Sequence, residues 1–319
     1  MKHLISLKEQ TKDDIIEILD LAKKLKVKPS DCSQLKNSKN NAFCGKKMLL
    51  LFEKNSTRTK LSFIAAAADL EGHYMVLDAQ SSQAGISNMR DEIRAMMSYC
   101  DVLVYRALDV ENVELASSFN MVPVIDACSN KYHPAQALGD LLTMSEVSNG
   151  IDKIGKVVWL GIENNVRNSL AIVCHKMGIH LWIASPYVHQ ESIDEDLEKI
   201  LSSSPYIHRT KNIEEALKDA DFIHTDTWMD MEYFNGSGIK PEFLNEFKRR
   251  KKLLLPYQLS ATLLEKHDSN AKIMHCMPCH EGYEITRDAI DHKNSVIFKQ
   301  AENRFHIEKA MLSWIFNAK

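Results

Sequence analysis

The sequence predicts an α/β protein with two doubly wound parallel-sheet domains. Short apolar runs typical of strands alternate with longer helical segments through the first half of the chain, as in a parallel sheet covered by helices on both faces. The second half repeats this alternation after a break at Ser148, Asn149 and Gly150. With 319 residues, 45% of them hydrophobic, the chain can bury a core in each of two domains.

The first half is expected to begin with a buried strand at 48–52, where apolar residues stand together. An alanine-rich helix at 61–70 follows, and Gly72 closes it. Pro134 suits the first turn of a helix and opens the helix at 134–147 that links the two halves. The remaining elements of this half are strands at 73–78, 102–105 and 122–125 and helices at 88–99 and 110–119.

The second half is expected to contain strands at 156–161, 181–184, 222–225 and 272–275 and helices at 168–177, 191–202 and 212–218. The segment 301–304 is expected to open the last helix. In doubly wound folds ligands bind at the carboxyl ends of the strands, and the conspicuous polar clusters of this sequence follow strands. Sheets that face each other would place the active site in the interdomain cleft.

Composition excludes several classes of protein. A net charge of −3 provides no basic surface for nucleic acid, and no apolar run approaches the length of a membrane span. The N-terminal segment lacks the apolar core of a signal peptide, which favours a cytoplasmic location. The seven cysteines are odd in number and scattered, which argues against a disulfide framework.

Two motifs that suggest a metal or a cofactor are incomplete. Cys276 and Cys279 form one C-x-x-C pair without a second pair at zinc spacing, so we expect neither a metal nor a redox role. The strand that ends at Gly161 is followed by Ile-Glu-Asn-Asn instead of G-x-G-x-x-G. Because the glycines that allow close approach are missing, we expect no nicotinamide or flavin.

The segment 52–60 is the most informative stretch of the chain. It is a hydroxyl-rich turn that opens a helix, where free N–H groups and the helix macrodipole favour an anion. Ser56, Thr57 and Thr59 add hydroxyl donors, and Arg58 adds a planar fork suited to phosphate. A lone Ser-Thr pair would more often be an ordinary N-cap, but the arginine and the second threonine favour a phosphate cradle.

Other polar residues stand at strand or helix ends. His133 and Gln136 are three residues apart on one helix face and suit a small group such as C(=O)NH₂, although a capping histidine with an exposed glutamine is the alternative. Arg106 ends a strand, where a surface arginine is the alternative. Gln83 lies in a segment expected to form a lid, and Arg304 stands near the start of the last helix, where a capping salt bridge is the alternative.

Taken together, these residues resemble the transcarbamylase family in order and spacing over nearly the whole chain. Each piece alone is weak, but the combination is highly specific. The chain is most similar to the ornithine carbamoyltransferases. The motifs that carry the resemblance are Ser56-Thr57-Arg58-Thr59, Arg106, His133-Pro134-Ala135-Gln136, Asn164-Asn165, Asp226, His275-Cys276-Met277-Pro278 and Arg304.

The resemblance implies a carbamoyl-phosphate-binding domain at 1–147, to which a C-terminal helix at 302–319 returns, and an ornithine-binding domain at 148–301. It also implies an active site between the domains and a homotrimer, or a multiple of trimers. Gln83 matches a glutamine that completes the site of the adjacent subunit. The partners are then small-molecule substrates, with no metal or organic cofactor, no nucleic acid and no membrane.

The resemblance also implies how carbamoyl phosphate is bound. The residues of 56–59 would hold its phosphate, and Arg106 and His133 would polarise its carbonyl oxygen. Gln136 would bind its amide, and Arg304 would add positive charge near the carbamoyl group. The catalytic set is expected to be Arg106, His133, Asp226 and Cys276.

The acceptor side resembles that of an ornithine enzyme. Asn165 resembles the residue that binds the carboxylate of the amino acid, Asp226 the carboxylate that pairs with its α-ammonium, and Cys276 the cysteine beside the attacking amine. Aspartate carbamoyltransferases typically carry proline at the position of this cysteine, so a basic acceptor is favoured. Met277 belongs to the same side, and its bond to Pro278 is a candidate for the cis form, since the trans preference of X–Pro is only about 0.5–1 kcal/mol.

The sequence departs from the family pattern at two places. Ornithine enzymes usually continue with x-Ser-Met-Gly after Asp-x-Trp, but this chain carries Asp230, Met231 and Glu232 there. Extra acidic groups near the amine pocket could select a different cationic acceptor, and we place Asp230 and Met231 among the acceptor-binding residues. Lys60 stands where the pattern ends with arginine, which keeps the charge but loses the fork.

The predicted reaction moves the carbamoyl group of carbamoyl phosphate to the side-chain amine of ornithine, giving citrulline and phosphate. Two alternatives stay open. One is a carbamoyltransferase for another amine, such as putrescine or another diamino acid. The other is a non-catalytic relative that binds carbamoyl phosphate. Citrulline formation separates an enzyme from a binding module, and a panel of amines separates the two enzymes.

Overall fold

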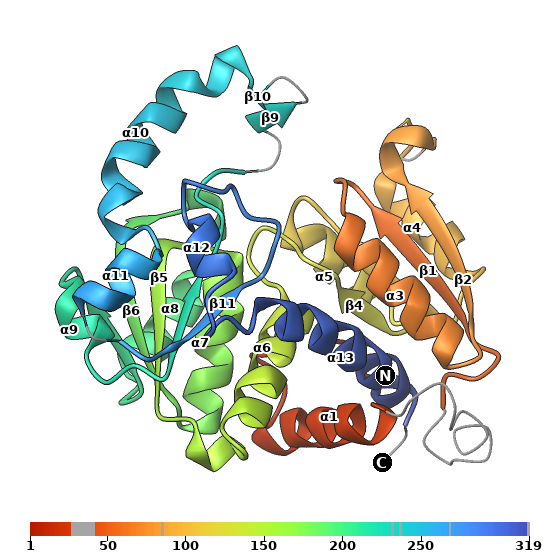
Figure 1. The fold of residues 1–319 in the computed structure, drawn as a ribbon. Helices are drawn as coiled ribbons and strands as arrows, with labels where there is room; N and C mark the ends of the chain where they lie inside the picture. Colours follow the sequence, from red (N-terminus) through yellow and green to blue (C-terminus); the bar gives the residue numbers. More distant parts are fainter. Residues whose placement is uncertain (27–41, 84–85, 231–232, 236–237, 268, 318–319) are drawn as a thin grey trace. The chain divides into compact units, whose positions relative to one another are not determined.

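The computed structural model describes residues 1–26, 42–83, 86–230, 233–235, 238–267 and 269–317. The chain forms two compact units. The first unit contains Met1–Leu142, Asn168–Val173 and Glu302–Lys319, and the second contains Thr143–Arg167 and Cys174–Ala301. Each unit holds one parallel sheet with helices, so the expected class of two doubly wound α/β sheets is confirmed (Figure 1).

The sheet of the first unit has its parallel strands in the order β2-β1-β3-β4. The strands are β1 (Lys47–Phe52), β2 (His73–Asp78), β3 (Val102–Arg106) and β4 (Val124–Asp126). Strand order runs outward from β1 in both directions, so the topological switch point lies between β1 and β3. The register pairs Phe52 with Arg106, and the segment after β1 therefore leaves the sheet beside Arg106.

The helices of the first unit are α1 (Lys12–Leu25), α3 (Thr57–Asp69), α4 (Met89–Met97), α5 (Val110–Ser118), most of α6 (Pro134–Val147) and most of α13 (Ile297–Phe316). A capping box between Thr11 and Asp14 starts α1. Gly72 follows α3, and a Cβ atom there would meet the ring of Phe43 at 2.2 Å, so this position requires glycine. Buried side chains of β1, β3, α4 and α5 form the apolar core of this unit.

The sheet of the second unit has its parallel strands in the order β11-β8-β5-β6-β7. The strands are β5 (Lys156–Glu163), β6 (His180–Val188), β7 (Ile207–Thr210), β8 (Phe222–Thr225) and β11 (Lys272–His275). The switch point of this sheet lies between β5 and β8. The register pairs His275 with Thr225, so the residues that follow these two strands emerge side by side.

The second unit also contains α7 (Asn165–Met177, in part), α8 (Glu195–Ser202), α9 (Ile213–Leu217), α10 (Leu244–Leu254), α11 (Ala261–Lys266) and α12 (Arg287–Ile290). A two-residue antiparallel pair joins β9 (Phe234–Asn235) and β10 (Gly238–Ile239). One apolar cluster packs around β5, β8 and β11. A smaller cluster is built on Ile162, Trp228, Met229 and Leu254.

Short 3₁₀ turns complete the connections of the two units. They are η2 (Ala79–Ser81), η3 (Ile151–Lys153), η4 (Gln190–Ser192), η6 (Pro241–Phe243) and η7 (Leu255–Tyr257). Among the helices of the described residues, none has both the length and the apolar character needed to cross a membrane.

Most expected elements are confirmed, including the strands at 73–78, 222–225 and 272–275 and the helix at 134–147. Four helix starts were wrong. Helix α3 begins at Thr57 and not at 61, and helix α8 begins at Glu195 and not at 191. Helix α7 begins at Asn165 and not at 168, because Asn164 caps it with hydrogen bonds from the next turn. Helix α13 begins at Ile297, so Arg304 lies inside the helix instead of opening it. The sequence analysis also did not predict strand β7, the β9–β10 pair or helices α1, α10, α11 and α12.

Candidate active site

In the first unit, the ends of β1 and β3 bring basic side chains to one edge of the sheet. Arg106 is the last residue of β3, and Lys54 stands two residues after β1. Between them, Glu53 accepts hydrogen bonds from the backbone of Leu108 at 2.6 Å and from the Asn112 amide at 3.2 Å, and it also bonds the Tyr105 hydroxyl. The Glu53 carboxylate is therefore committed to fixing the turn after β3.

The N-terminus of α3 lies directly after this edge and is not capped by a side chain. Ser56 occupies the N-cap position, but its hydroxyl makes no capping hydrogen bond, and the first turn holds no acidic residue. The ordinary N-cap interpretation of the Ser-Thr pair is therefore wrong. A helix start with no acid in its first turn keeps its partial positive charge and its orphan N–H groups available to an anion.

His133 is buried among four basic side chains of the first unit. Burial lowers the pKa of its imidazole well below the ordinary value, and Arg304, Arg106, Arg58 and Lys54 lower it further. The imidazole is therefore neutral at physiological pH. We call Lys54, Arg58, Arg106, His133 and Arg304 the cation cluster.

Arg106 and His133 of the cation cluster each have a buried nitrogen without a partner. Within the described residues, the buried Nε of Arg106 and the buried Nδ1 of His133 make no hydrogen bond. Buried polar atoms are normally satisfied, and a group without a partner costs about 1–3 kcal/mol. Concentrated positive charge with unsatisfied buried polar atoms is the pattern expected of a site for an anionic ligand that also offers hydrogen-bonding oxygens.

Arg304 ties the cation cluster together from α13. Its guanidinium donates to the Thr59 hydroxyl, to the Gln136 carboxamide oxygen at 3.3 Å and to Glu308 at 3.1 Å. Gln136 in turn donates to Asp140 at 2.8 Å. The structure thus brings together the predicted residues Thr59, His133, Gln136, Arg106 and Arg304.

Glu308 is the counter-charge beneath Arg304. Burial raises the pKa of its carboxyl to about 7, although Arg304 and Ser62 partly oppose the shift. Asp126, at the end of β4, shows the same behaviour, since burial raises its pKa to about 7. The cation cluster therefore rests on buried carboxyl groups that hold a proton more readily than usual.

Two other predicted residues of the first unit lie outside this cluster. Gln83 is exposed on the segment after β2, and the rest of the expected lid, Ala84 and Gly85, lies outside the described residues. Lys60 forms an ion pair with Asp78 at 2.8 Å. The lysine that replaces the family's arginine thus reaches a carboxylate at the end of β2.

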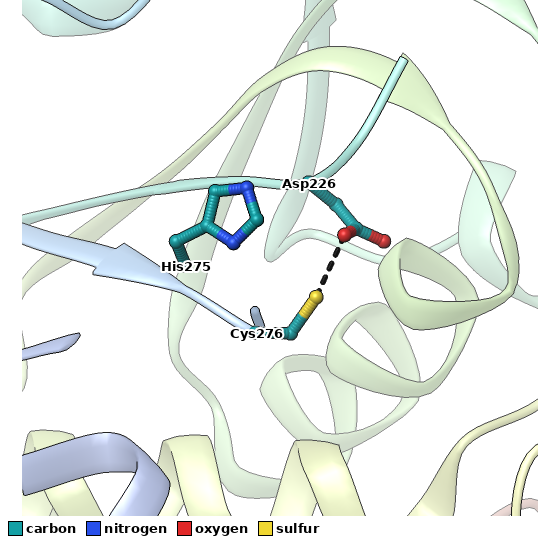
Figure 2. Close-up of side chains that lie close together, drawn as sticks. All are labelled: Asp226, His275 and Cys276. Carbon is teal, nitrogen blue, oxygen red and sulfur yellow. Dashed lines mark hydrogen bonds between the residues drawn. The ribbon is translucent and has the colours of Figure 1, made fainter. Parts of the chain in front are cut away.

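In the second unit, Asp226 and Cys276 follow the paired strand ends of β8 and β11. The Cys276 thiol donates to the Asp226 carboxylate at 2.7 Å, and His275 stands beside them (Figure 2). The amide of Asn164 donates to the other oxygen of Asp226 at 2.7 Å. The backbone N–H of Thr227 donates, also at 2.7 Å, to the oxygen that the thiol contacts. We call Asn164, Asp226 and Cys276 the thiol–carboxylate cluster.

Asn164 was not among the predicted site residues. It was passed over because Asn165 matched the family motif at the strand end, yet Asn165 is the first residue of α7. Asn164 both caps α7, by accepting from the N–H groups of Val166 and Arg167, and holds Asp226. Lys54 was also missed, and the only available signal was its place in the segment after the first strand.

Asp226, His275 and Cys276 offer three ligand atoms within 4.8 Å of one another, a group that could hold a metal ion. The imidazole is already used, however. Its Nδ1 accepts from the backbone N–H of Met277 at 2.8 Å, so its Nε2 carries the proton and donates to Glu284 at 3.3 Å. A metal would have to displace one of these bonds. The Met277–Pro278 peptide is cis, as expected.

Asp230 lies on the loop after β8, close to two basic side chains. Its carboxylate is 3.3 Å from Arg250 and 3.4 Å from His189. Burial alone would raise its pKa, but these two partners hold it below the ordinary value. The predicted Met231 and its neighbour Glu232 lie outside the described residues.

Comparisons with known proteins agree with the motifs. Residues 2–146 match the family profile "Aspartate/ornithine carbamoyltransferase, carbamoyl-P binding domain", and residues 154–315 match "Aspartate/ornithine carbamoyltransferase, Asp/Orn binding domain". An ornithine carbamoyltransferase from Bacillus subtilis is 36% identical, with 98% of this chain and 93% of that protein covered. One from Archaeoglobus fulgidus is 34% identical, with 98% and 96% covered.

Solved structures show the same relationship. The ornithine carbamoyltransferase of Pyrococcus furiosus matches with a TM-score of 0.83 and 34% identity over 98% of this chain and 96% of that one. The anabolic ornithine carbamoyltransferase of Campylobacter jejuni matches with a TM-score of 0.82 and 29% identity over 99% of both chains. The two family profiles cover the two parallel sheets and nearly all of the chain. The chain belongs to the aspartate/ornithine carbamoyltransferase family.

Proposed function

We propose that this protein transfers the carbamoyl group of carbamoyl phosphate to the side-chain amine of ornithine, releasing citrulline and phosphate. The observation that carries this proposal is the cation cluster, in which four basic side chains surround a neutral, buried His133. Such a site suits a small phosphorylated ligand with a carbonyl group. The choice of ornithine is supported by the relatives at 33–36% identity, which are named ornithine carbamoyltransferases.

On the donor side, we assign the phosphate to the start of α3. The hydroxyls of Ser56, Thr57 and Thr59 and the guanidinium of Arg58 would hold its oxygens together with the first backbone N–H groups. Arg106 and neutral His133 would donate to the carbonyl oxygen. Their unsatisfied nitrogens support this assignment, because hydrogen-bond donors aimed at a developing oxyanion are usually the largest catalytic term.

Gln136 and Arg304 would complete the donor side. Both residues already bond each other, and Thr59 is held by the same guanidinium. We propose that Gln136 contacts the carbamoyl amide and that Arg304 sets the positive charge around it. The three elements α3, α6 and α13 would thereby be fixed in one geometry before the ligand arrives, which lowers the entropy cost of reaching the transition state.

On the acceptor side, we assign the α-ammonium of ornithine to Asp226 and its carboxylate to Asn165. Cys276 and Met277 would lie beside the attacking amine, and Met231 is the remaining residue that we assign to this side. In the step itself, the neutral amine forms a C–N bond to the carbonyl carbon, the bond from that carbon to the phosphate oxygen breaks, and the departing phosphate takes up the proton that the amine loses. The departing phosphate stays in the cradle at α3.

We also propose the division of labour that the family pattern implies. Residues 1–147, with the C-terminal helix at 302–319, would bind carbamoyl phosphate, and residues 148–301 would bind the amino acid. A cytoplasmic location is supported by the cysteines, because the six within the described residues are all free thiols and free thiols persist in reducing compartments.

A homotrimer is the assembly we propose. Gln83 is exposed and would reach the neighbouring subunit. The edge strand β2 exposes apolar side chains, with Tyr74 at 48% and Val76 at 38%. Leu61, on the adjacent helix α3, is 62% exposed. An apolar edge of this kind is unusual on an isolated subunit and supports a contact with another copy.

Steady-state turnover with carbamoyl phosphate and a panel of amines tests the function. We expect citrulline and phosphate in equal amounts with ornithine, and a much lower kcat/KM with putrescine. A kcat/KM higher with putrescine than with ornithine would show that putrescine is the acceptor. If no amine gave product while calorimetry detected carbamoyl phosphate binding, the protein would be a non-catalytic relative that binds carbamoyl phosphate.

A further inference from the structure

The loop after β8 carries an ion-pair hub that none of the proposed substrate contacts uses. Arg250, on α10, has a side chain only 5% exposed. Its guanidinium donates to the backbone oxygen of Trp228 at 3.2 Å and to Asp230 at 3.3 Å. It also donates to the Tyr233 hydroxyl at 3.1 Å and to Glu246 at 2.8 Å. One buried cation thus holds three positions of the loop.

The loop also packs against β5 and α10 through its apolar side chains. Trp228 is fully buried, and its ring lies against Gly161 of β5, where a Cβ atom would meet the indole nitrogen at 3.0 Å. Gly161 has φ 113°, which favours glycine. Met229 and Leu254 of α10 belong to the same apolar cluster. The indole fixes the loop against β5, and Arg250 fixes the same loop against α10.

Asp226 stands at the start of this loop. It directly precedes Thr227, whose hydroxyl donates to the backbone oxygen of Met229 at 2.8 Å. Arg250 holds the next residues, Trp228 and Asp230. A shift of the loop would therefore move the carboxylate that we assign to the α-ammonium of the acceptor.

We propose that Arg250 is a positioning residue for acceptor binding and that Asp230 acts as its counter-ion instead of contacting the acceptor. This inference rests on the proposed function and deepens it. The negative charge of Asp230 is paired inside the protein with Arg250, and the His189 imidazole lies 3.4 Å from the same carboxylate. The Asp230 carboxylate therefore adds no net attraction for a dication, and an amino acid with one carboxylate stays acceptable.

Two single variants and their combination test the proposal. Arg250→Gln should raise the KM for ornithine about tenfold or more, since several hydrogen bonds to a charged group are lost, and leave the affinity for carbamoyl phosphate unchanged. Asp230→Asn should raise the same KM less. If Asp230 acts through Arg250, the double variant should match Arg250→Gln alone. If the two effects multiply, Asp230 contacts the acceptor directly and the proposal is overturned.

Arg249→Gln is the matched control, because Arg249 bonds Glu246 and the Tyr187 hydroxyl but neither Trp228 nor Asp230. Its KM for ornithine should stay within about twofold of the wild type. If the KM for ornithine rose equally in Arg249→Gln and Arg250→Gln, the effect would be a general one of α10 and the proposal would be overturned. Arg250→Lys keeps the charge without the fork and should fall between wild type and Arg250→Gln, which covers the case in which Arg250→Gln does not fold.

Hydrogen exchange without substrate tests the anchoring role of Arg250 independently of the proposed reaction. The amides of Trp228, Met229 and Asp230 should exchange faster in Arg250→Gln than in wild type or Arg249→Gln. Unchanged exchange would overturn the anchoring role even if turnover were normal. If the wild type made no citrulline while this exchange difference appeared, the proposed function would fail and the anchoring role would stand.

Discussion

The cation cluster and the thiol–carboxylate cluster satisfy their polar atoms in different ways. In the first, positive charge is concentrated, and Arg106 and His133 each keep one buried nitrogen without a partner within the described residues. In the second, Asp226 accepts from Asn164, Cys276 and the Thr227 backbone. One site is built to donate hydrogen bonds to a ligand, and the other holds its central carboxylate in place with the protein's own donors.

This difference matches the chemistry proposed for the two substrates. A phosphate brings several acceptor oxygens and two negative charges, so unsatisfied donors and excess positive charge match it. An amino acid brings its own ammonium donors, so a carboxylate that is already oriented is the matching partner. The comparison predicts that substitutions in the two clusters affect different substrates.

The largest effect is expected from Glu308, the buried acid beneath the cation cluster. Its folded-state pKa of about 7 lies above the ordinary value of 4.5. The folded state therefore binds more protons than the unfolded state between these values, and stability falls as the pH rises through this window. At 1.36 kcal/mol per pKa unit, the loss is about 3 kcal/mol.

Glu308→Gln should remove this dependence. Denaturant unfolding at pH 5, 6 and 7.5 measures it, since the free energy of unfolding should drop less across the series in the variant than in the wild type. Asp126 titrates in the same window. The free energy of unfolding of both the wild type and Glu308→Gln should therefore still depend on pH through Asp126. Parallel curves for wild type and Glu308→Gln would show that Glu308 does not titrate there.

The next effect concerns Arg58. Removing a charge-assisted hydrogen bond costs about 1.5–3 kcal/mol, so Arg58→Ala should weaken carbamoyl phosphate binding about 10- to 150-fold. Calorimetric titration measures the affinity directly. Arg94→Ala, an exposed arginine on α4 of the same unit, is the control. Equal affinity in Arg58→Ala and the wild type would remove Arg58 from the donor site.

A similar but acceptor-specific effect is expected from Asp226. Asp226→Asn should raise the KM for ornithine about tenfold or more, because a charged partner is lost. Its affinity for carbamoyl phosphate should stay at the wild-type value. The comparison between the two clusters breaks down if Asp226→Asn weakens carbamoyl phosphate as strongly as ornithine.

The smallest effect is expected from Cys276. Its thiol contributes one hydrogen bond to Asp226, which is worth about 0.5–1.5 kcal/mol. Cys276→Ala should therefore change kcat/KM for ornithine by about 2- to 12-fold. Cys279→Ala, the neighbouring free thiol, should leave it near the wild-type value. A loss far beyond this range in Cys276→Ala would give the thiol a chemical role beyond orienting Asp226.

The two clusters also differ in how well sequence predicted them. The segment from Ser56 to Thr59 was identified from its own residues, because a hydroxyl-rich turn before a helix is a local pattern. Asn164 was missed, because its bond to Asp226 joins residues far apart in the chain. Its capping role is a local signal that could have moved the predicted start of α7 from 168 to Asn165.

The loop after β8 shows the same limit of prediction from sequence. The sequence analysis placed Asp230 among the acceptor-binding residues. In the structure, Asp230 instead pairs with Arg250 and His189. Nothing in the local sequence links these three residues, because Arg250 comes from α10 and His189 follows β6. Helix α10 itself was not predicted.

The sequence by itself determined the alternation of strands and helices and the family, because these depend on residues that are neighbours in the chain. Only the tertiary structure decided which side chains meet. The pairing of β8 with β11 sets Asp226 beside Cys276, and α13 carries Arg304 to Thr59 and Gln136. Strand order and register fix such contacts, and they follow from burying both faces of a sheet at once, which no short segment encodes alone.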